Sequence, residues 1–222
     1  MPQVFGKKRR LWGMGMLGNI VFFLEIMGTV AFAASGAMIA VNRKMDIFGI
    51  AMLGLFTATG GGVLRDLLLG NTPPATFRQP VYALTALVVA GVMFLKPVRS
   101  RWNAHGRVFD AVLLAMDSVG LGVFTVVGVE VALAADSNLF TAVFVGVVTG
   151  VGGGILRDVM AGQLPFVFVK HFYASASLIG ALACALLWPW LGQLGAMLTG
   201  AVIVIELRLL AARFHWKLPR PE

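Results

Sequence analysis

Apolar residues run along this chain in seven long stretches that short polar segments separate. About 20 helical residues cross a bilayer core of about 30 Å, so these stretches have the length of membrane spans. Backbone groups in lipid must pair internally, which favours helices, and the ~10-residue alternating strands of a membrane barrel do not occur. The pattern predicts an all-α membrane protein with one transmembrane domain over residues 1–222. Its seven transmembrane helices are expected at residues 18–41, 46–69, 80–95, 109–134, 139–161, 171–190 and 193–213.

One unit occurs twice, at an offset of 92 residues. Residues 60–66 read GGGVLRD and residues 152–158 read GGGILRD, and Glu25 matches Asp117 at the same offset. Repeat one covers residues 18–95, repeat two covers 109–190, and the extra helix 193–213 lies outside both. Since three crossings change the side of the membrane, the two three-helix units are predicted to be inverted repeats.

The N-terminus allows a second interpretation. A basic cluster, an apolar run and the sequence Ala31-Phe32-Ala33 also resemble a signal peptide with its cleavage site. The repeat favours the first interpretation, because it places residues 25–36 inside the mature fold.

Composition supports the membrane assignment. Hydrophobic residues make up 59% of the chain, charged residues make up 13%, and the mean hydropathy is +0.87. Soluble domains carry about 25% charged residues, so a water-soluble fold is excluded. The single cysteine, Cys184, excludes an intrachain disulfide, and the three histidines have no metal-ligand spacing.

The net charge of +8 has two possible meanings, nucleic-acid binding or membrane orientation. The cations lie in short loops between apolar stretches, which favours orientation and predicts no nucleic-acid partner. Five cations belong to the N-terminal side: Lys7, Lys8, Arg9, Arg10 and Arg78. Eleven belong to the C-terminal side: Arg43, Lys44, Lys96, Arg99, Arg101, Arg107, Lys170, Arg208, Arg213, Lys217 and Arg220. A multi-pass protein of the plasma (inner) membrane is expected, with the C-terminus cytoplasmic and the N-terminus outside. The cluster Lys7–Arg10 conflicts with this orientation, and translation from Met14 or Met16 would remove the conflict.

The two glycine triplets also have two possible meanings. Glycine lets neighbouring helices approach closely, but a triplet also weakens a helix by about 3 kcal/mol relative to alanine. We favour kinked or broken helices that face each other near the membrane midplane and whose freed carbonyls line a pore. A monovalent cation could then sit at these carbonyls, without a defined ligand set. The predicted pore residues are Gly60, Gly61, Gly62, Gly152, Gly153 and Gly154.

Charged residues inside the apolar stretches are costly in lipid and therefore need partners. We expect Glu25 to pair with Arg65 and Asp117 to pair with Arg157. Neighbours on a helix point in different directions, so Asp66 and Asp158 are expected to serve a different surface from the arginines beside them. These six residues either join helices or set the field of a permeation path, and both roles stay open.

With its doubled Gly-Gly-Gly-x-Leu-Arg-Asp motif, its three-plus-three-plus-one helices and its basic C-terminal side, the chain resembles the prokaryotic trimeric intracellular cation (TRIC) channel family. Such sequences are also described as glycine-transporter-like. The resemblance covers about residues 17–213. It implies a homotrimer in which each subunit has its own pore for K⁺ and Na⁺, with kinks at the two glycine triplets. It also implies that Arg65, Asp66, Arg157 and Asp158 accompany the pore. Animal members have a lysine-containing, lipid-associated segment that this chain lacks.

Three functions remain in view. The first is a K⁺/Na⁺-permeable channel, the second an alternating-access carrier for a small neutral amino acid such as glycine, and the third a membrane scaffold. No nucleophilic triad or phosphate-binding loop is recognisable, so we expect neither an enzyme nor a cofactor.

Overall fold

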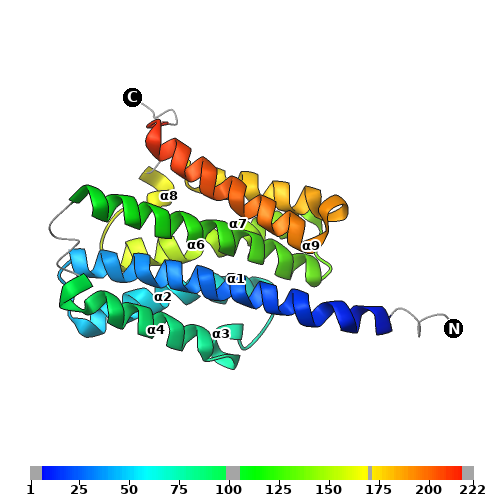
Figure 1. Cartoon of the computed structure of the whole chain (residues 1–222), viewed down its shortest axis with the longest axis horizontal. Helices are drawn as coiled ribbons and strands as arrows, with labels where there is room; N and C mark the ends of the chain where they lie inside the picture. Colours follow the sequence, from blue (N-terminus) through cyan, green and yellow to red (C-terminus); the bar gives the residue numbers. More distant parts are fainter. Residues whose placement is uncertain (1–6, 99–105, 170–171, 217–222) are drawn as a thin grey trace.

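The computed structural model of the chain describes residues 7–98, 106–169 and 172–216. Within these residues the fold is helical and contains no strand. The helices are α1 (Lys7–Asn42), α2 (Ile47–Leu68), α3 (Ala75–Arg78), α4 (Val81–Phe94), α6 (Gly106–Ala134), α7 (Leu139–Met160), α8 (Phe166–Val169) and α9 (Ala174–Arg213) (Figure 1).

Five of these helices are long and apolar enough to cross a membrane: α1 from Gly18, α2, α6, α7 and α9. The shorter α4 is also apolar. In α9, Pro189 precedes a break at Gly192, where φ is +67°. Figure 1 shows the two arms of α9 folding back on each other at this elbow. A Cβ added to Gly180 would lie 2.8 Å from the carbonyl oxygen of Gly200, so the arms pack side by side. The predicted boundary between helices 171–190 and 193–213 therefore falls at the elbow.

The helix boundaries repeat as the sequence motif does. Asp46 caps α2 by accepting a 2.7 Å hydrogen bond from the Gly49 amide, and Asn138, 92 residues later, caps α7 in the same way at 2.8 Å. Such caps satisfy amide groups that the first turn of a helix leaves unpaired. Both helices end before a glycine of positive φ, Gly70 and Gly162. The repeat thus extends from the motif to the turns that set the ends of the helices.

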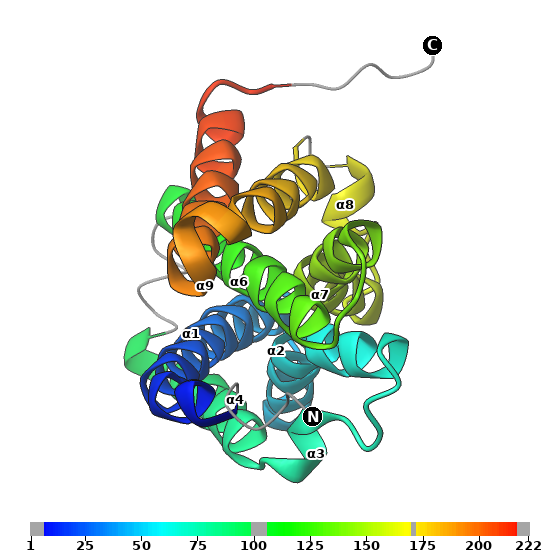
Figure 2. The ribbon, with the colours of Figure 1, turned by 90° about the vertical axis from the view of Figure 1, so that its right-hand side faces the viewer.

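The two halves pack around a shared centre. Helices α1, α2 and α4 form one group, and α6, α7 and α9 form another. The groups meet through α1 against α6 and through α2 against α7, as the end-on view in Figure 2 shows. The rings of Phe32 and Phe124, which are equivalent in the two repeats, lie 5.3 Å apart at this junction.

The glycine triplets lie where α2 crosses α7, and neither helix is broken there. A Cβ added to Gly61 would lie 2.1 Å from the carbonyl oxygen of Thr149, and one added to Gly153 would lie 2.2 Å from that of Thr57. The predicted breaks are therefore wrong, the alternative of a kink stays a prediction, and the competing interpretation, close packing of helices, is confirmed by these contacts. The contacts are reciprocal at the 92-residue offset, as across a two-fold axis.

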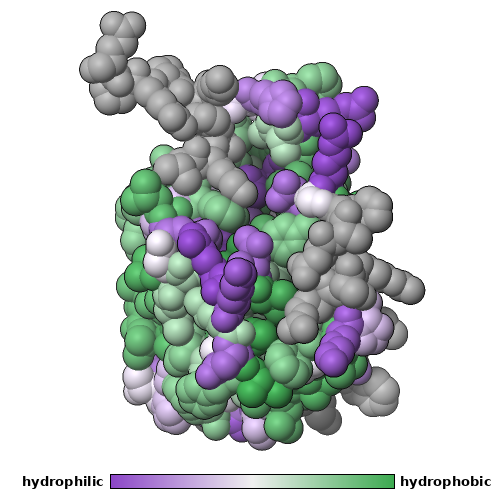
Figure 3. Space-filling view, turned by 90° about the vertical axis from the view of Figure 1, so that its left-hand side faces the viewer, coloured by the Kyte–Doolittle hydropathy of each residue, from purple (hydrophilic) through white to green (hydrophobic). Residues whose placement is uncertain are grey.

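The outer surface is strongly apolar. Large side chains such as Phe48, Phe140 and Trp190 are more than half exposed. Continuous apolar surfaces of this kind mark contact with a membrane or a partner. Polar residues gather at the end of the bundle where α1 ends, and Figure 3 looks at this end.

The cations assigned from the sequence to the C-terminal side divide into three groups. Five of these cations are exposed in the structure: Arg43, Lys44, Lys96, Arg107 and Arg213. Outside the described residues lie Arg99, Arg101, Lys170, Lys217 and Arg220, and the side chains of Lys7–Arg10 are likewise not described. Arg208 differs from both groups because it is buried within α9, so it is not one of the loop cations from which the orientation is predicted.

Candidate functional site

The first charge cluster joins α1, α2 and α4 through Glu25, Arg65, Asp66 and Tyr82. Arg65 Nη1 lies 3.5 Å from Glu25 Oε1, and Arg65 Nε donates to Asp66 Oδ1 at 2.8 Å. The Tyr82 hydroxyl donates to Glu25 Oε2 at 2.5 Å. The second oxygen of Asp66 accepts from the Ala75 amide at 2.7 Å, which ties α2 to the start of α3. One arginine thus links two carboxylates, and each carboxylate is held by a further donor.

The second charge cluster joins α6, α7 and α9 through Asp117, Arg157, Asp158, Tyr173 and Arg208. Arg157 donates to Asp117 Oδ1 at 2.6 Å and to Asp158 Oδ1 at 2.8 Å. Arg208 Nη2 lies 3.1 Å from Asp117 Oδ2, and the Tyr173 hydroxyl donates to Asp117 Oδ1 at 3.2 Å. The guanidinium carbon of Arg208 lies 4.5 Å from the centre of the Tyr173 ring.

Two further groups brace the second cluster. The Phe166 amide donates to Asp158 Oδ2 at 2.7 Å, and the Phe166 ring lies 4.7 Å from the guanidinium carbon of Arg157. Arg157 also donates to the hydroxyl of Ser35, which belongs to the other repeat. The equivalent of Ser35 in repeat two is Val127, so Arg65 has no matching hydroxyl.

The two clusters are built alike. The predicted ion pairs Glu25–Arg65 and Asp117–Arg157 are both present. The expectation that Asp66 and Asp158 serve a different surface from the neighbouring arginines is wrong. Each arginine bends its Nε toward the adjacent carboxylate, which also receives an amide from the following short helix. The aspartates therefore connect each arginine to the loop after its helix.

Sequence reasoning missed the tyrosines, although a signal for them exists. Tyr82 and Tyr173 are the chain's two tyrosines, and they lie 91 residues apart. One residue fewer in the second loop explains why this offset differs from 92. Arg208 was missed for another reason. It lies outside the repeat, and it was counted among the orienting cations of the C-terminal side instead of as a buried partner for Asp117.

The clusters differ in burial and in charge. The side chain of Glu25 is 18% exposed, whereas those of Asp117 and Arg157 are 1% and 0% exposed. Among the residues that the structure describes, the two carboxylates and one guanidinium of the first cluster leave a net charge of −1. In the second cluster, two carboxylates face two guanidinium groups among the described residues. Buried charges need this kind of compensation, because removal from water costs several kcal/mol for each ion.

A small, partly open pocket, with room for about one water molecule, adjoins the first cluster. Its lining combines the Glu25 carboxylate with the hydroxyls of three threonines and one tyrosine, beside Arg65 and Gly62. Carboxylate and hydroxyl oxygens suit hard cations, while the Arg65 guanidinium in the same lining offsets the charge of Glu25. Among the described residues, no group of three or more His, Cys, Asp or Glu could hold a metal ion. The full lining is Glu25, Thr29, Ala58, Thr59, Gly62, Arg65, Ala75, Thr76, Tyr82 and Phe124.

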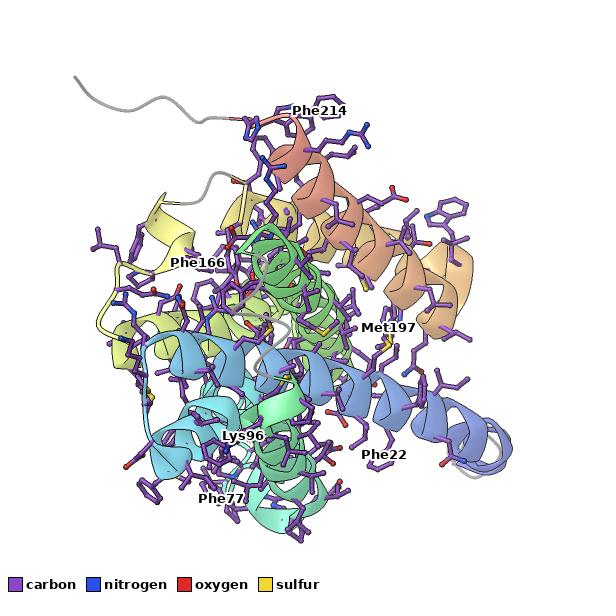
Figure 4. All side chains as sticks on the ribbon, turned by 60° about the vertical axis from the view of Figure 1, so that its left-hand side comes forward. Phe22, Phe77, Lys96, Phe166, Met197 and Phe214 are labelled. Atoms are coloured by element: carbon purple, nitrogen blue, oxygen red, sulfur yellow. The ribbon has the colours of Figure 1, made fainter. Side chains whose placement is uncertain are left out.

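The last glycine of each triplet lies beside one of the two clusters. Gly62 lines the pocket, and a Cβ added to its equivalent Gly154 would lie 2.5 Å from the Tyr173 hydroxyl. Along α1, Glu25 and Ser35 are ten residues apart, which corresponds to about 15 Å of helix. In Figure 4, Phe22, whose ring lies 6.1 Å from that of Tyr82, and Phe166 of the second cluster lie on opposite sides of the bundle. The clusters thus occupy different depths of the bundle, on either side of the α2–α7 crossing.

Comparison with known proteins gives this architecture a family. A family model described as "Glycine transporter" matches residues 22–97 and 114–189, so it matches each repeat once. The UPF0126 inner membrane protein YadS of Escherichia coli is 37% identical over 90% of this chain and 95% of its own length.

Solved structures match along nearly the whole fold. A TRIC channel orthologue from Rhodobacter sphaeroides is 33% identical, with a TM-score of 0.80 over 89% of this chain and 99% of that chain. A prokaryotic TRIC channel crystallised in 0.5 M KCl has a TM-score of 0.81 at 27% identity, over 90% of this chain and 98% of that chain. These matches are to channels rather than to enzymes, and they support a membrane cation channel. The chain therefore belongs to the prokaryotic TRIC channel family.

Proposed function

We propose that this protein is a K⁺/Na⁺-permeable channel and that each subunit contains its own pore. The carrying observation is the pocket that Glu25, Tyr82 and Gly62 line, beside a cluster whose described charges sum to −1. An oxygen-lined cavity beside a net negative charge raises the local concentration of cations and repels anions. The TRIC cation channels that share this fold support the same proposal.

The proposed permeation path follows the two glycine triplets. Gly60–Gly62 and Gly152–Gly154 bring α2 and α7 into backbone contact, so this crossing is proposed as the constriction. One side of this crossing carries Glu25, Arg65 and Asp66, and the other side carries Asp117, Arg157 and Asp158. In this role the triplets act through close packing and not through broken helices.

The proposed topology has seven crossings, since the elbow at Gly192 divides α9 into two spans. Repeat one (18–95) and repeat two (109–190) are then inverted relative to each other, and 193–213 is the extra helix of a single domain. Exposed cations at the end where α1 finishes favour a cytoplasmic C-terminus and an outside N-terminus in the inner membrane. A reporter enzyme that is active only in the periplasm can be fused after residue 213. Activity of this fusion would contradict the proposed orientation.

The fold family also supports a homotrimer as the working assembly. Cross-linking in native membranes, followed by mass measurement, tests this directly. A monomer or a dimer as the largest species would exclude the trimer without affecting the pore proposed within each subunit.

Planar-bilayer recording of the purified protein tests the channel. We expect unitary currents in symmetric KCl and also in NaCl. Under a salt gradient, these currents should reverse at the equilibrium potential of the cation. Macroscopic leak without unitary steps, or reversal at the chloride potential, would contradict the proposal.

A second candidate is a carrier for a small neutral amino acid, because the matching family model is described as a glycine transporter. A carrier shows saturable glycine counterflow in proteoliposomes without unitary currents. The two assays on one preparation separate the candidates.

A further inference from the structure

The third glycine of each triplet has a different neighbour in the two repeats. A Cβ added to Gly154 would lie 2.5 Å from the Tyr173 hydroxyl, so this hydroxyl lies directly against α7. Among the described residues, a Cβ added to the equivalent Gly62 would find its nearest contact outside the local backbone at Arg65 Nη2, 4.0 Å away. The Tyr82 hydroxyl therefore does not take the place at α2 that its counterpart takes at α7.

The pocket of repeat one lies between Tyr82 and Gly62, which both line it. It has room for about one water molecule, and a phenolic oxygen is of similar size. The Tyr82 hydroxyl would therefore fill the pocket if it moved to Gly62. Burial follows the same division between the repeats. Tyr173 is 2% exposed, whereas Tyr82 is 9% exposed beside a glycine that is only partly buried.

The hydrogen-bond acceptors of the two hydroxyls differ in length. The Tyr82 hydroxyl donates to the carboxylate of Glu25. The Tyr173 hydroxyl donates to the carboxylate of Asp117, which is the repeat equivalent of Glu25. The glutamate side chain is one methylene longer, so its carboxylate has a longer reach from its helix. A longer reach lets the acceptor hold the tyrosine at a distance from the third glycine.

The rings of the two tyrosines also have different neighbours. The guanidinium carbon of Arg208, a residue of α9 outside the repeat, lies 4.5 Å from the centre of the Tyr173 ring. Tyr82 instead faces the ring of Phe22, whose centre lies 6.1 Å away and which is 42% exposed. A buried cation thus fixes Tyr173 in its place, whereas Tyr82 lies against a half-exposed side chain that can move with it.

We propose that Tyr82 is a gate residue whose hydroxyl has two positions. In the open position, which the structure shows, the hydroxyl is bonded to Glu25 and leaves the pocket open. In the closed position it lies against Gly62 and fills the pocket, as Tyr173 lies against Gly154 in repeat two. Closure would block the approach from the first cluster to the α2–α7 crossing. This role in conduction rests on the proposed channel function, whereas the two positions of the hydroxyl do not.

Fluorine NMR of the purified full-length protein in detergent tests the two positions without any measurement of current. The chain has two tyrosines, so labelling with meta-fluorotyrosine gives two resonances, which Tyr82→Phe and Tyr173→Phe assign. Replacing H₂O by D₂O shifts the resonance of a fluorine in contact with water. We expect this isotope shift at Tyr82 and not at Tyr173. Equal isotope shifts at the two tyrosines would overturn the proposal.

Glu25→Asp gives repeat one the shorter acidic residue of repeat two. The Tyr82 hydroxyl should then follow its acceptor toward Gly62. One hydrogen bond shifts a two-state equilibrium about two- to tenfold, so the isotope shift at Tyr82 should fall at least about twofold. Glu206→Asp makes the same chemical change at an exposed position and is the matched control, with both resonances unchanged. An unchanged Tyr82 resonance in a folded Glu25→Asp protein would overturn the proposal.

Gly62→Ala tests the closed position directly and replaces Glu25→Asp if that variant does not fold. Its methyl group has room beside Arg65 and occupies the place that the hydroxyl takes on closing. In bilayer recordings, closed intervals should therefore shorten about two- to tenfold. Gly91→Ala, whose added Cβ has nothing within 4 Å, should leave them unchanged. Closed intervals of equal length in the two alanine variants would contradict the gate.

Recording from the acidic variant separates this inference from the channel proposal. Glu25→Asp should lower the open probability about two- to tenfold, and the added change Tyr82→Phe, which removes the hydroxyl, should restore it. The expected fluorine shifts without any K⁺ current would overturn the channel and keep the two positions of Tyr82. A K⁺ current whose open probability neither change affects would overturn the gate and keep the channel.

Discussion

The two charge clusters are the most informative comparison within this molecule. Both join a carboxylate, an arginine, a neighbouring aspartate and a tyrosine, with closely similar bonds from Nε of the arginine. The first is partly open and carries a charge of −1, whereas the second is sealed by Arg208 and braced by Ser35. The same local chemistry thus lines a partly open pocket in one half of the protein and forms an internal staple in the other. What differs is the set of neighbours that each half receives from outside its own repeat.

The largest expected effect comes from removing the central arginine of the sealed cluster. Arg157→Met leaves buried carboxylates without their main partner, and breaking a buried pair in this way costs about 3–5 kcal/mol. The matched change Arg65→Met affects a cluster whose glutamate can reach water, so it should cost less. Thermal unfolding of both variants in one detergent measures the difference. Equal losses would show that the two clusters are energetically alike.

Next in size is the close approach of α2 and α7. Gly61→Ala and Gly153→Ala each place a methyl group about 2 Å from a backbone carbonyl oxygen, which should destabilise the protein by about 1–3 kcal/mol. Gly91→Ala is the control, since nothing lies within 4 Å of its added Cβ. Size-exclusion profiles after a temperature ramp provide the measurement. Full tolerance of both alanines would mean that the helices can separate at low cost.

An effect of comparable size should follow from opening the sealed cluster. Arg208→Met removes one charged hydrogen bond, worth about 1.5–3 kcal/mol, while Arg157 still compensates Asp117. It also gives the second cluster the charge of the first. Thermal unfolding of the variant in detergent measures the loss. Arg213→Met, at an exposed position, is the control and should leave the melting temperature unchanged.

The smallest expected effects belong to the tyrosine hydroxyls. Tyr173→Phe and Tyr82→Phe each remove one hydrogen bond to a carboxylate, worth about 0.5–1.5 kcal/mol. Stability should change similarly in the two variants, but only Tyr82→Phe should alter K⁺ conductance. A conductance change in Tyr173→Phe alone would place the permeation path on the other side of the bundle.

Much of this fold was predictable, because membrane helices appear in a sequence as long apolar stretches. The boundaries of α2, α4, α6 and α7 lie within three residues of the predicted ones, and the predicted gap after residue 190 coincides with the elbow at Gly192. The pairs Glu25–Arg65 and Asp117–Arg157 followed from the cost of isolated charge in lipid. These features depend on local composition or on the repeat, and both can be read from one chain.

Other features depend on contacts that a single sequence does not contain. Glycine triplets weaken a helix in isolation, but here the backbone contact with the facing helix keeps α2 and α7 continuous. The direction of Asp66 and Asp158 depends on the loops that return over the ends of their helices. The burial of Arg208 depends on α9 folding back toward α6. In each case a tertiary contact reversed an expectation based on a local rule.

Arg208 also affects how the two halves can move. A rocking carrier with inverted repeats alternates by exchanging the conformations of its halves, and this exchange is easiest when the two arrangements have similar free energies. Among the described residues, one half is fastened to α9 by a buried guanidinium, and the other half has no equivalent fastening. The exchanged arrangement would have to release Arg208 from Asp117 and Tyr173 and find it an equivalent partner. We therefore expect the two arrangements to differ in free energy, which favours a stationary conduit over a protein that alternates between two faces.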